Sequence, residues 1–374
     1  MEYRQKKSVE VKQNTNLLKF ISLYRQELMG LAILSVMYWH FVWAARQYTK
    51  ASAEVMRSIS FYGTIFGSLG VEIFVFLSGL GLYFSMARSP KVLPFYRKRF
   101  ERIIIPYVFI VPMLLALLSY LSKYSLTRYF SELTLISFCT RRSTILWYVA
   151  FCIVVYIFFP VIFKILQNKN GEKYCAALAV LLMVLFICTA KIFPKFYHNV
   201  EIALGRIPLF VIGSIYGKKI YNNQNMNKFD WCFILSGLIV KLIYILSFYF
   251  KSYHSYMPAK KIFDSMRPFM RFIMGWSALS YILILACLFY LVRKTFLSKL
   301  FAWFGSMSLE LYMSHMLVKQ IFYKLGIAVW RVRYYALAML ISIFISYIVH
   351  KATITVFSEI EERRKKKLKA DTSN

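Results

Sequence analysis

A histidine near the end of the first long apolar segment and a glutamate within the second are the residues best suited to chemistry. His40 lies in the last third of residues 27–43, and Glu72 lies within residues 63–86. An ionisable side chain inside a bilayer costs at least about 2.5–3.5 kcal/mol unless it has a partner or water, so such residues mark functional sites. A histidine beside a carboxylate is also a common general-base arrangement. We therefore predict that His40 and Glu72 are catalytic.

The composition places these segments in a membrane. Hydrophobic residues make up 59% of the 374 residues, charged residues make up 17%, and the mean hydropathy is +0.54. A soluble domain averages roughly 45–50% apolar and about 25% charged residues. The net charge of +32 comes from Lys and Arg in short loops between apolar segments, where basic residues set membrane orientation. The lipid bilayer is therefore the expected partner, and this charge pattern argues against nucleic acid.

The apolar segments predict an all-α, polytopic integral membrane protein with about ten transmembrane helices. Arg206 with Pro208 interrupts the sixth segment, and Glu310 with His315 interrupts the ninth. The predicted spans cover about 28–45, 62–86, 103–122, 143–166, 174–192, 200–217, 229–250, 269–291, 304–324 and 335–357.

The distribution of basic residues predicts that both termini are cytoplasmic. Six Lys and Arg residues precede the first span, six more lie in residues 86–102, and another six in residues 363–369. An even number of spans and the positive-inside rule then place both ends of the chain in the cytoplasm. The predicted organisation is a cytoplasmic segment (1–27), a transmembrane domain (28–357) and a basic cytoplasmic tail (358–374).

The six cysteines predict neither a metal site nor a disulfide framework. They form no CxxC pair and no Cys/His metal spacing, and most of them lie inside apolar segments. A cysteine in such a segment behaves as a small hydrophobic residue.

Three ionisable residues are expected at similar depth. At about 1.5 Å per residue, His40 lies roughly 18 Å, Glu72 roughly 21 Å and His315 roughly 16 Å from the cytoplasmic end of its span. A shared polar site explains all three. Each residue also has a structural interpretation, since a histidine can bond a neighbouring helix and Glu72 can pair with Arg or His. Packing is the favoured interpretation for Glu310.

A second cluster of possible functional residues precedes the third span. Arg97, Lys98, Arg99 and Arg102 lie together at its cytoplasmic start, with Arg99 and Arg102 on one helical face. Arginine forks suit the phosphates of a cytoplasmic ligand. Basic residues that serve only to fix membrane orientation would give the same composition. Ligand binding and membrane orientation therefore both stay open as interpretations.

Several segments, taken in order, resemble the acyltransferase family 3 membrane proteins, which O-acylate surface sugars. LMGLAILSVMYWH resembles the family's first span, which ends in its essential histidine, and GVEIFVFLSGLGLYFS is similar to its second-span signature. FYRKRFERIIIPY resembles the Arg-rich start of the third span. Later blocks of the family are similar to three further segments of this chain, LWYVAFCIVVYIFFP, GRIPLFVIGSIYGKK and SMSLELYMSH. The resemblance covers nearly the whole chain.

One position departs from the family pattern. The family commonly has Arg or Lys eleven positions before the histidine, where this chain has Met29. Arg25 lies one helical turn earlier on roughly the same face, so its long side chain is the expected substitute.

The resemblance implies a multi-pass enzyme of the bacterial cell membrane. It implies transfer of an acyl group, with acetyl expected, from cytoplasmic acyl-CoA to a hydroxyl of a surface polysaccharide or its glycolipid precursor. Acyl-CoA would be a co-substrate, with no tightly bound cofactor. Capsule, exopolysaccharide, lipopolysaccharide, wall polymer and small glycolipid acceptors stay open, as does the oligomeric state.

The expected arrangement combines this reaction with the two clusters. Arg99 and Arg102, with Arg97, would hold the nucleotide phosphates, and His40 would deprotonate the acceptor while Glu72 orients it. An acyl-enzyme intermediate on the histidine stays open. Further residues expected at the pocket are Arg25, Trp147, Tyr148 and His315, although packing is favoured for the two aromatics.

Two other functions compete with this one. A glycolipid transporter or flippase would line its path with polar residues near the midplane, but no internal repeat is visible in the sequence. A polysaccharide polymerase would favour larger extracytoplasmic loops than those found here.

Overall fold

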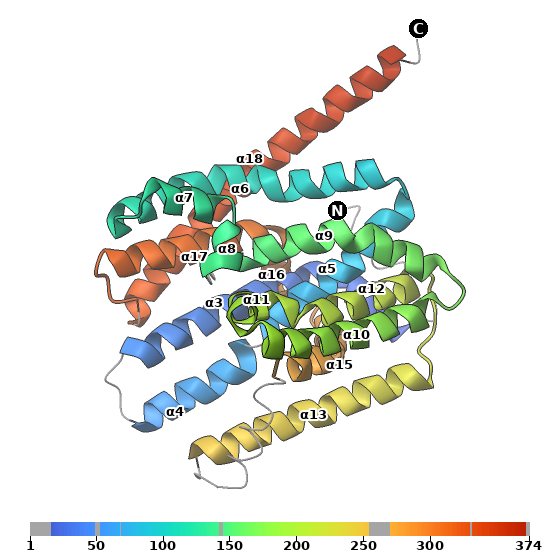
Figure 1. Cartoon of the computed structure of the whole chain (residues 1–374), viewed down its shortest axis with the longest axis horizontal. Coiled ribbons are helices and arrows are strands. Elements are labelled where there is room, and N and C mark those ends of the chain that lie inside the picture. The colour runs from blue at the N-terminus through green and yellow to red at the C-terminus, as the bar shows by residue number, and fades with distance from the viewer. Residues whose placement is uncertain are drawn as a thin grey trace.

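The described part of the chain is a bundle of helices (Figure 1). The computed structural model describes residues 16–48, 53–67, 69–141, 145–253, 270–329 and 331–371. No strand occurs within these ranges, so the predicted all-α fold class is confirmed.

Within the described ranges, nine helical segments are long and apolar enough to cross a membrane. They correspond to nine of the ten predicted spans, and the chain is a multi-pass membrane protein. Their helices are α3 (Arg25–Tyr48), α5 (Leu69–Arg88), α6 (Val92–Ser122), α9 (Trp147–Gln167), α10 (Gly171–Ile192), α11 (Pro194–Leu204) with α12 (Ile207–Tyr221), α13 (Lys228–Tyr253), α15 (Met270–Leu291) and α18 (Val332–Asp371).

The predicted span at 304–324 is corrected. The chain breaks at Met307 into α16 (Phe296–Ser306) and α17 (Ser308–Lys324). Because α17 has only 17 residues and carries several polar side chains, it falls short of a hydrophobic span. It is nevertheless buried along most of its length, against α3, α6 and α18. The interior of the bundle therefore contains a polar helix.

The remaining helices are short. They are α2 (Leu17–Leu23), α4 (Ala53–Tyr62), α7 (Leu126–Leu133) and α8 (Ile136–Arg141). A π-helical turn, η2 (Gly63–Gly67), precedes α5, so the predicted helix at 62–86 is not a continuous α-helix. Figure 1 shows α7 and α8 at the end of the bundle opposite to the one from which the last turns of α18 project.

Glycines bring several helices into backbone contact. A Cβ atom on Gly30 of α3 would overlap the backbone of Phe301, and one on Gly305 of α16 would overlap that of Gln26. Gly79 of α5 and Gly213 of α12 show the same close approach between their helices. Small residues allow this packing in membranes, where apolar side chains gain little by leaving lipid.

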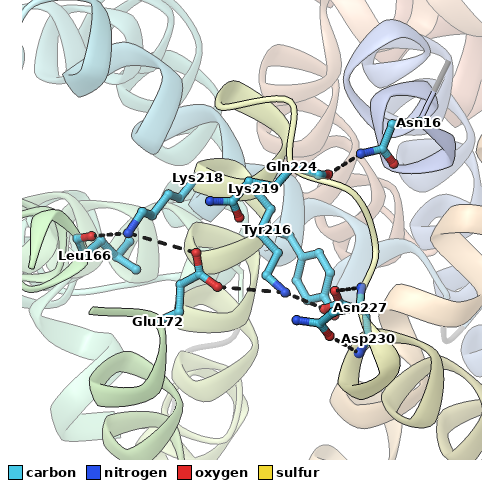
Figure 2. Close-up of polar contacts among 9 residues, drawn as sticks. All are labelled: Asn16, Leu166, Glu172, Tyr216, Lys218, Lys219, Gln224, Asn227 and Asp230. Carbon is cyan, nitrogen blue, oxygen red and sulfur yellow. Dashed lines mark hydrogen bonds and ion pairs between the residues drawn. The ribbon is translucent and has the colours of Figure 1, made fainter. Parts of the chain in front are cut away.

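A polar network joins the ends of α9, α10, α12 and α13 (Figure 2). Asp230 accepts hydrogen bonds from Lys219 Nζ at 2.6 Å and from the Tyr216 hydroxyl at 2.8 Å. Lys218 Nζ donates to the Leu166 carbonyl at 2.6 Å, and Glu172 lies within 4.0 Å of both lysines. These cations are already bound to protein groups, so the network fixes helix ends.

Candidate active site

An internal cavity of about 510 Å³ has His40 in its wall. The cavity lies between α3, α5, α6, α9, α17 and α18. Its lining combines three kinds of side chain: arginines, aromatics, and an acid–histidine pair on α17 and α18. These are Arg25, Arg99, Arg102 and Arg206; Trp39, Trp147, Tyr148 and Tyr312; and Glu310 with His350.

A second cavity of about 1000 Å³ adjoins the first. Both are lined by Arg25, Gly81, Arg99, Arg102 and Phe357. The second cavity is also lined by charged residues near the start of α6 and near the end of α18. Those of α6 are Arg97, Lys98 and Glu101, and those of α18 are Glu361 and Arg364. We call this end of the bundle the basic end. The two cavities together connect the basic end with His40.

Arg25, one of the residues expected at the pocket, lines both cavities. Its guanidinium group covers Gly81 of α5 so closely that a Cβ atom there would lie 2.5 Å from Arg25 Nη2. Met29, at the position where the family commonly has a basic residue, also lines the first cavity. Arg25 and His40 are fifteen residues apart on α3, which is about 22 Å along the helix axis.

The arginines of α6 differ in their surroundings. Arg99 is buried, and its Nε has no hydrogen-bond partner. Arg102 is exposed and lines both cavities. Arg97 is bound to Glu101 at 3.1 Å, and Arg364 of α18 also donates to Glu101. Arg99 and Arg102 therefore both line the two cavities, whereas Arg97 lines only the second one and is paired with Glu101.

The neighbours of His40 come from α17. Lys319 Nζ lies 3.3 Å from His40 Nδ1, and the ring centroids of His40 and His315 are 5.5 Å apart. His315 donates from Nδ1 to the Leu311 carbonyl at 2.8 Å, because a carbonyl can only accept. His315 does not line the cavity, so it lies behind His40. The expected proximity of the two histidines is observed.

Glu72 does not contact His40. Its Oε1 accepts from Arg206 Nε at 3.0 Å and lies 2.9 Å from Nη2, and both side chains are buried. Arg206 also donates to the Ile202 carbonyl at 2.6 Å and lies over the Trp147 ring at 5.3 Å. Both arginine nitrogens contact the same carboxylate oxygen, and the expected Glu72–His40 pair is not formed.

The two aromatics predicted at the pocket belong both to its wall and to the packing. Tyr148 bonds Ser78 at 3.0 Å through its hydroxyl, and its backbone N–H donates to Tyr312 at 3.3 Å. Trp147 packs edge-to-face against Tyr148 and lines the cavity beside Arg206. These contacts hold a rigid aromatic surface on the side of the cavity formed by α9.

A family model described as an acyltransferase domain, acyltransferase family 3, matches residues 28–351. The chain belongs to this family. No curated protein and no solved structure matches it. The protein is therefore a membrane acyltransferase, and the connected cavities are its candidate active site.

Sequence reasoning missed three residues of this acyltransferase site. Arg206 was considered only as an interruption of an apolar segment, and Lys319 and His350 were not singled out. The spacing of Lys319, four residues after His315 on one helix, is a signal that was present. His350 lies 3.0 Å from Glu310 through contact of α17 with α18, which no spacing reveals. In the described ranges, no group of three His, Cys, Asp or Glu residues is arranged to hold a metal ion.

The Glu72–Arg206 pair predicts strongly non-additive mutations. Glu72→Ala should destabilise the acyltransferase by about 3–5 kcal/mol, because it leaves the arginine charge buried without its partner. The double variant Glu72→Gln/Arg206→Met should recover most of that loss. Thermal unfolding in detergent would measure both effects. Independent, additive losses would show that the pair is not a coupled unit.

Proposed function

We propose that this membrane acyltransferase takes acyl groups, with acetyl the preferred one, from cytoplasmic acyl-CoA. The acceptor would be a hydroxyl of a cell-surface polysaccharide or its glycolipid precursor. The supporting observation is the pair of adjoining cavities that leads from the arginines of the basic end to His40. A long, thin donor with phosphates at one end and a thioester at the other suits such a path.

The phosphates of acyl-CoA would bind at Arg25, Arg99 and Arg102. Arg25 and Arg99 lie at the junction of the cavities, and the guanidinium of Arg99 has an unused donor at Nε. Guanidinium groups form paired, charge-assisted hydrogen bonds with phosphate oxygens. Arg97 would act at the rim, since Glu101 already engages it.

His40 would act as the general base at the inner end of the path. The acceptor O–H would give its proton to His40 as the oxygen attacks the thioester carbonyl carbon. The C–S bond would then break, and the departing thiolate would take the proton back from the imidazolium. These transfers balance and leave His40 neutral for the next cycle. Trp147 and Tyr148 would present an aromatic surface to the acceptor.

Both termini would face the cytoplasm. The basic end carries Arg97, Arg99 and Arg102, so the positive-inside rule assigns it to the side where acyl-CoA is available. An even number of crossings would require a tenth traverse, and under this proposal the broken helix α16–α17 would provide it although it is not a hydrophobic span. The alternative of a transporter or flippase gains nothing from the family assignment.

His40→Ala and His40→Gln should lower acyl transfer by about 10²–10⁴-fold, the usual loss for a positioned base. Transfer by purified protein, with acyl-CoA consumption measured directly, would report the effect. His198→Ala is the control, because His198 is exposed and lines neither cavity. Near wild-type transfer by His40→Ala, in protein that inserts normally, would refute the assignment of the base.

Gly81→Ala should raise the apparent KM for acyl-CoA several-fold. The new methyl group would displace the Arg25 guanidinium, the end of a flexible side chain, and would leave the backbone in place. Gly275→Ala is the control, since its methyl group would meet only Leu209 at ordinary contact distance. Initial rates at varied acyl-CoA concentration would be compared. An unchanged KM for Gly81→Ala would remove Arg25 from the donor site.

Thiol labelling should verify sidedness. Cys139 in α8 is exposed, so a variant that retains only this cysteine should react with an impermeant reagent in intact cells. Ser89→Cys, in a background without native cysteines, should react only after permeabilisation, because exposed Ser89 lies at the basic end. Reaction of the Ser89 variant in intact cells would reverse the orientation and place the arginines away from acyl-CoA.

A further inference from the structure

The amine of Lys319 lies against the proposed catalytic histidine and does not line the cavity. Lys319 is 7% exposed, and its Nζ is 3.3 Å from His40 Nδ1. His40 lines the cavity, whereas Lys319 does not. The lysine therefore reaches a substrate only through the histidine ring.

Lys319 has few other polar neighbours. Within the described ranges, no carboxylate lies within ion-pair distance of Nζ. Its second contact is the Trp43 ring, whose centroid is 5.8 Å from Nζ. His315, one turn earlier on α17, is committed to the Leu311 carbonyl through Nδ1. A carboxylate, the usual partner of a catalytic histidine, is thus replaced by an amine.

The charge of this amine determines which histidine nitrogen carries the proton. An ammonium group can only donate, so it would require an unprotonated Nδ1 and would place the proton of neutral His40 on Nε2. In that tautomer, Nε2 carries the proton and has no lone pair with which to accept another. An uncharged amine can instead accept from Nδ1–H through its lone pair, and Nε2 then carries the lone pair that a general base needs.

We propose that Lys319, as an uncharged amine, accepts the Nδ1 proton of His40 and thereby orients it as the base. This inference rests on the proposed function, because it assumes that His40 deprotonates the acceptor. During transfer, Nε2 takes the acceptor proton and Nδ1–H stays bonded to the amine. Nε2 then returns its proton to the departing thiolate, so the lysine is unchanged at the end of the cycle. Lys319 is accordingly a positioning residue.

The arrangement differs in a testable way from a cationic role. The Trp43 ring would favour an ammonium through its π face, although 5.8 Å is close to the limit of about 6 Å for that interaction. An ammonium would stabilise negative charge by donating, and arginine would then be the best replacement. An accepting amine is best replaced by a side chain that carries a neutral acceptor.

The test compares Lys319→Gln, Lys319→Met and Lys319→Arg in the purified full-length protein. The glutamine carbonyl oxygen can accept from Nδ1–H, methionine only fills the space, and arginine can only donate. We expect kcat to fall in the order Gln, Met, Arg, with Met at least about tenfold below the wild type and the KM for acyl-CoA unchanged. Lys324→Met, at an exposed position of the same helix, is the control and should keep full activity.

Chemical rescue adds a readout that a packing role would not give. Lys319→Ala should regain kcat when methylamine or ethylamine is added, because the small amine can occupy the space beside Nδ1. Highest activity in Lys319→Arg, or equal activity in the three variants without amine rescue, would overturn the proposal. His40→Ala is measured in parallel. If that variant stays active, the assignment of His40 as the base in the proposed function fails; if it is inactive while the lysine ranking is absent, only this inference fails.

Discussion

Burial of ionised groups in a low-dielectric bundle is the constraint on which this structure depends. A charge taken out of water is tolerated only with a partner, and the Glu72–Arg206 fork meets that requirement between α5 and the junction of α11 with α12. Arg206 lies where the chain breaks between these two helices, and it also faces the Trp147 ring of α9. The ion pair and the ring contact thus link α5, the α11–α12 junction and α9 beside the inner cavity.

The pairing has a chemical consequence beyond stability. Within the described part of the chain, Glu72 forms its hydrogen bond and ion pair with Arg206 alone, and the polar contact of His40 is with Lys319 of α17. Two other buried cations are likewise either paired with a carboxylate or left with an unused donor. Lys219 is bound to Asp230 at a helix junction, whereas Arg99 retains an unsatisfied donor beside the cavities. Of these two, the cation that retains a donor for a ligand is therefore the one that lacks a carboxylate partner among the described residues.

The sequence predicted nine of the spans and pointed to His40 and Arg25 in the cavity wall because hydropathy and isolated ionisable groups are local signals. The depth argument brought His40 and His315 together correctly, since distance along a helix follows from residue number. It could not choose the partner of Glu72, because that choice depends on which helices are neighbours and how each is rotated. It also expected one helix over 304–324, where the break at Met307 and the polar residues of α17 obscure the signal. Lys319 was missed for a related reason, because a lysine near a predicted helix end resembles a boundary residue.

The π-helical turn η2 lies between α4 and α5 in the chain. A Cβ atom on Gly67, at its end, would meet Trp39, the residue beside His40 in the wall of the cavity. A π turn holds about one residue more than an α turn, so deleting one residue within 63–67 could convert it to an α turn and leave α4 at nearly the same rotation relative to α5. The helix that carries Glu72 would keep its own contacts with α3 and α12. Gain or loss of one residue at this turn is thus a route by which the length of the enzyme's chain can change while the arrangement around the reaction chamber is preserved.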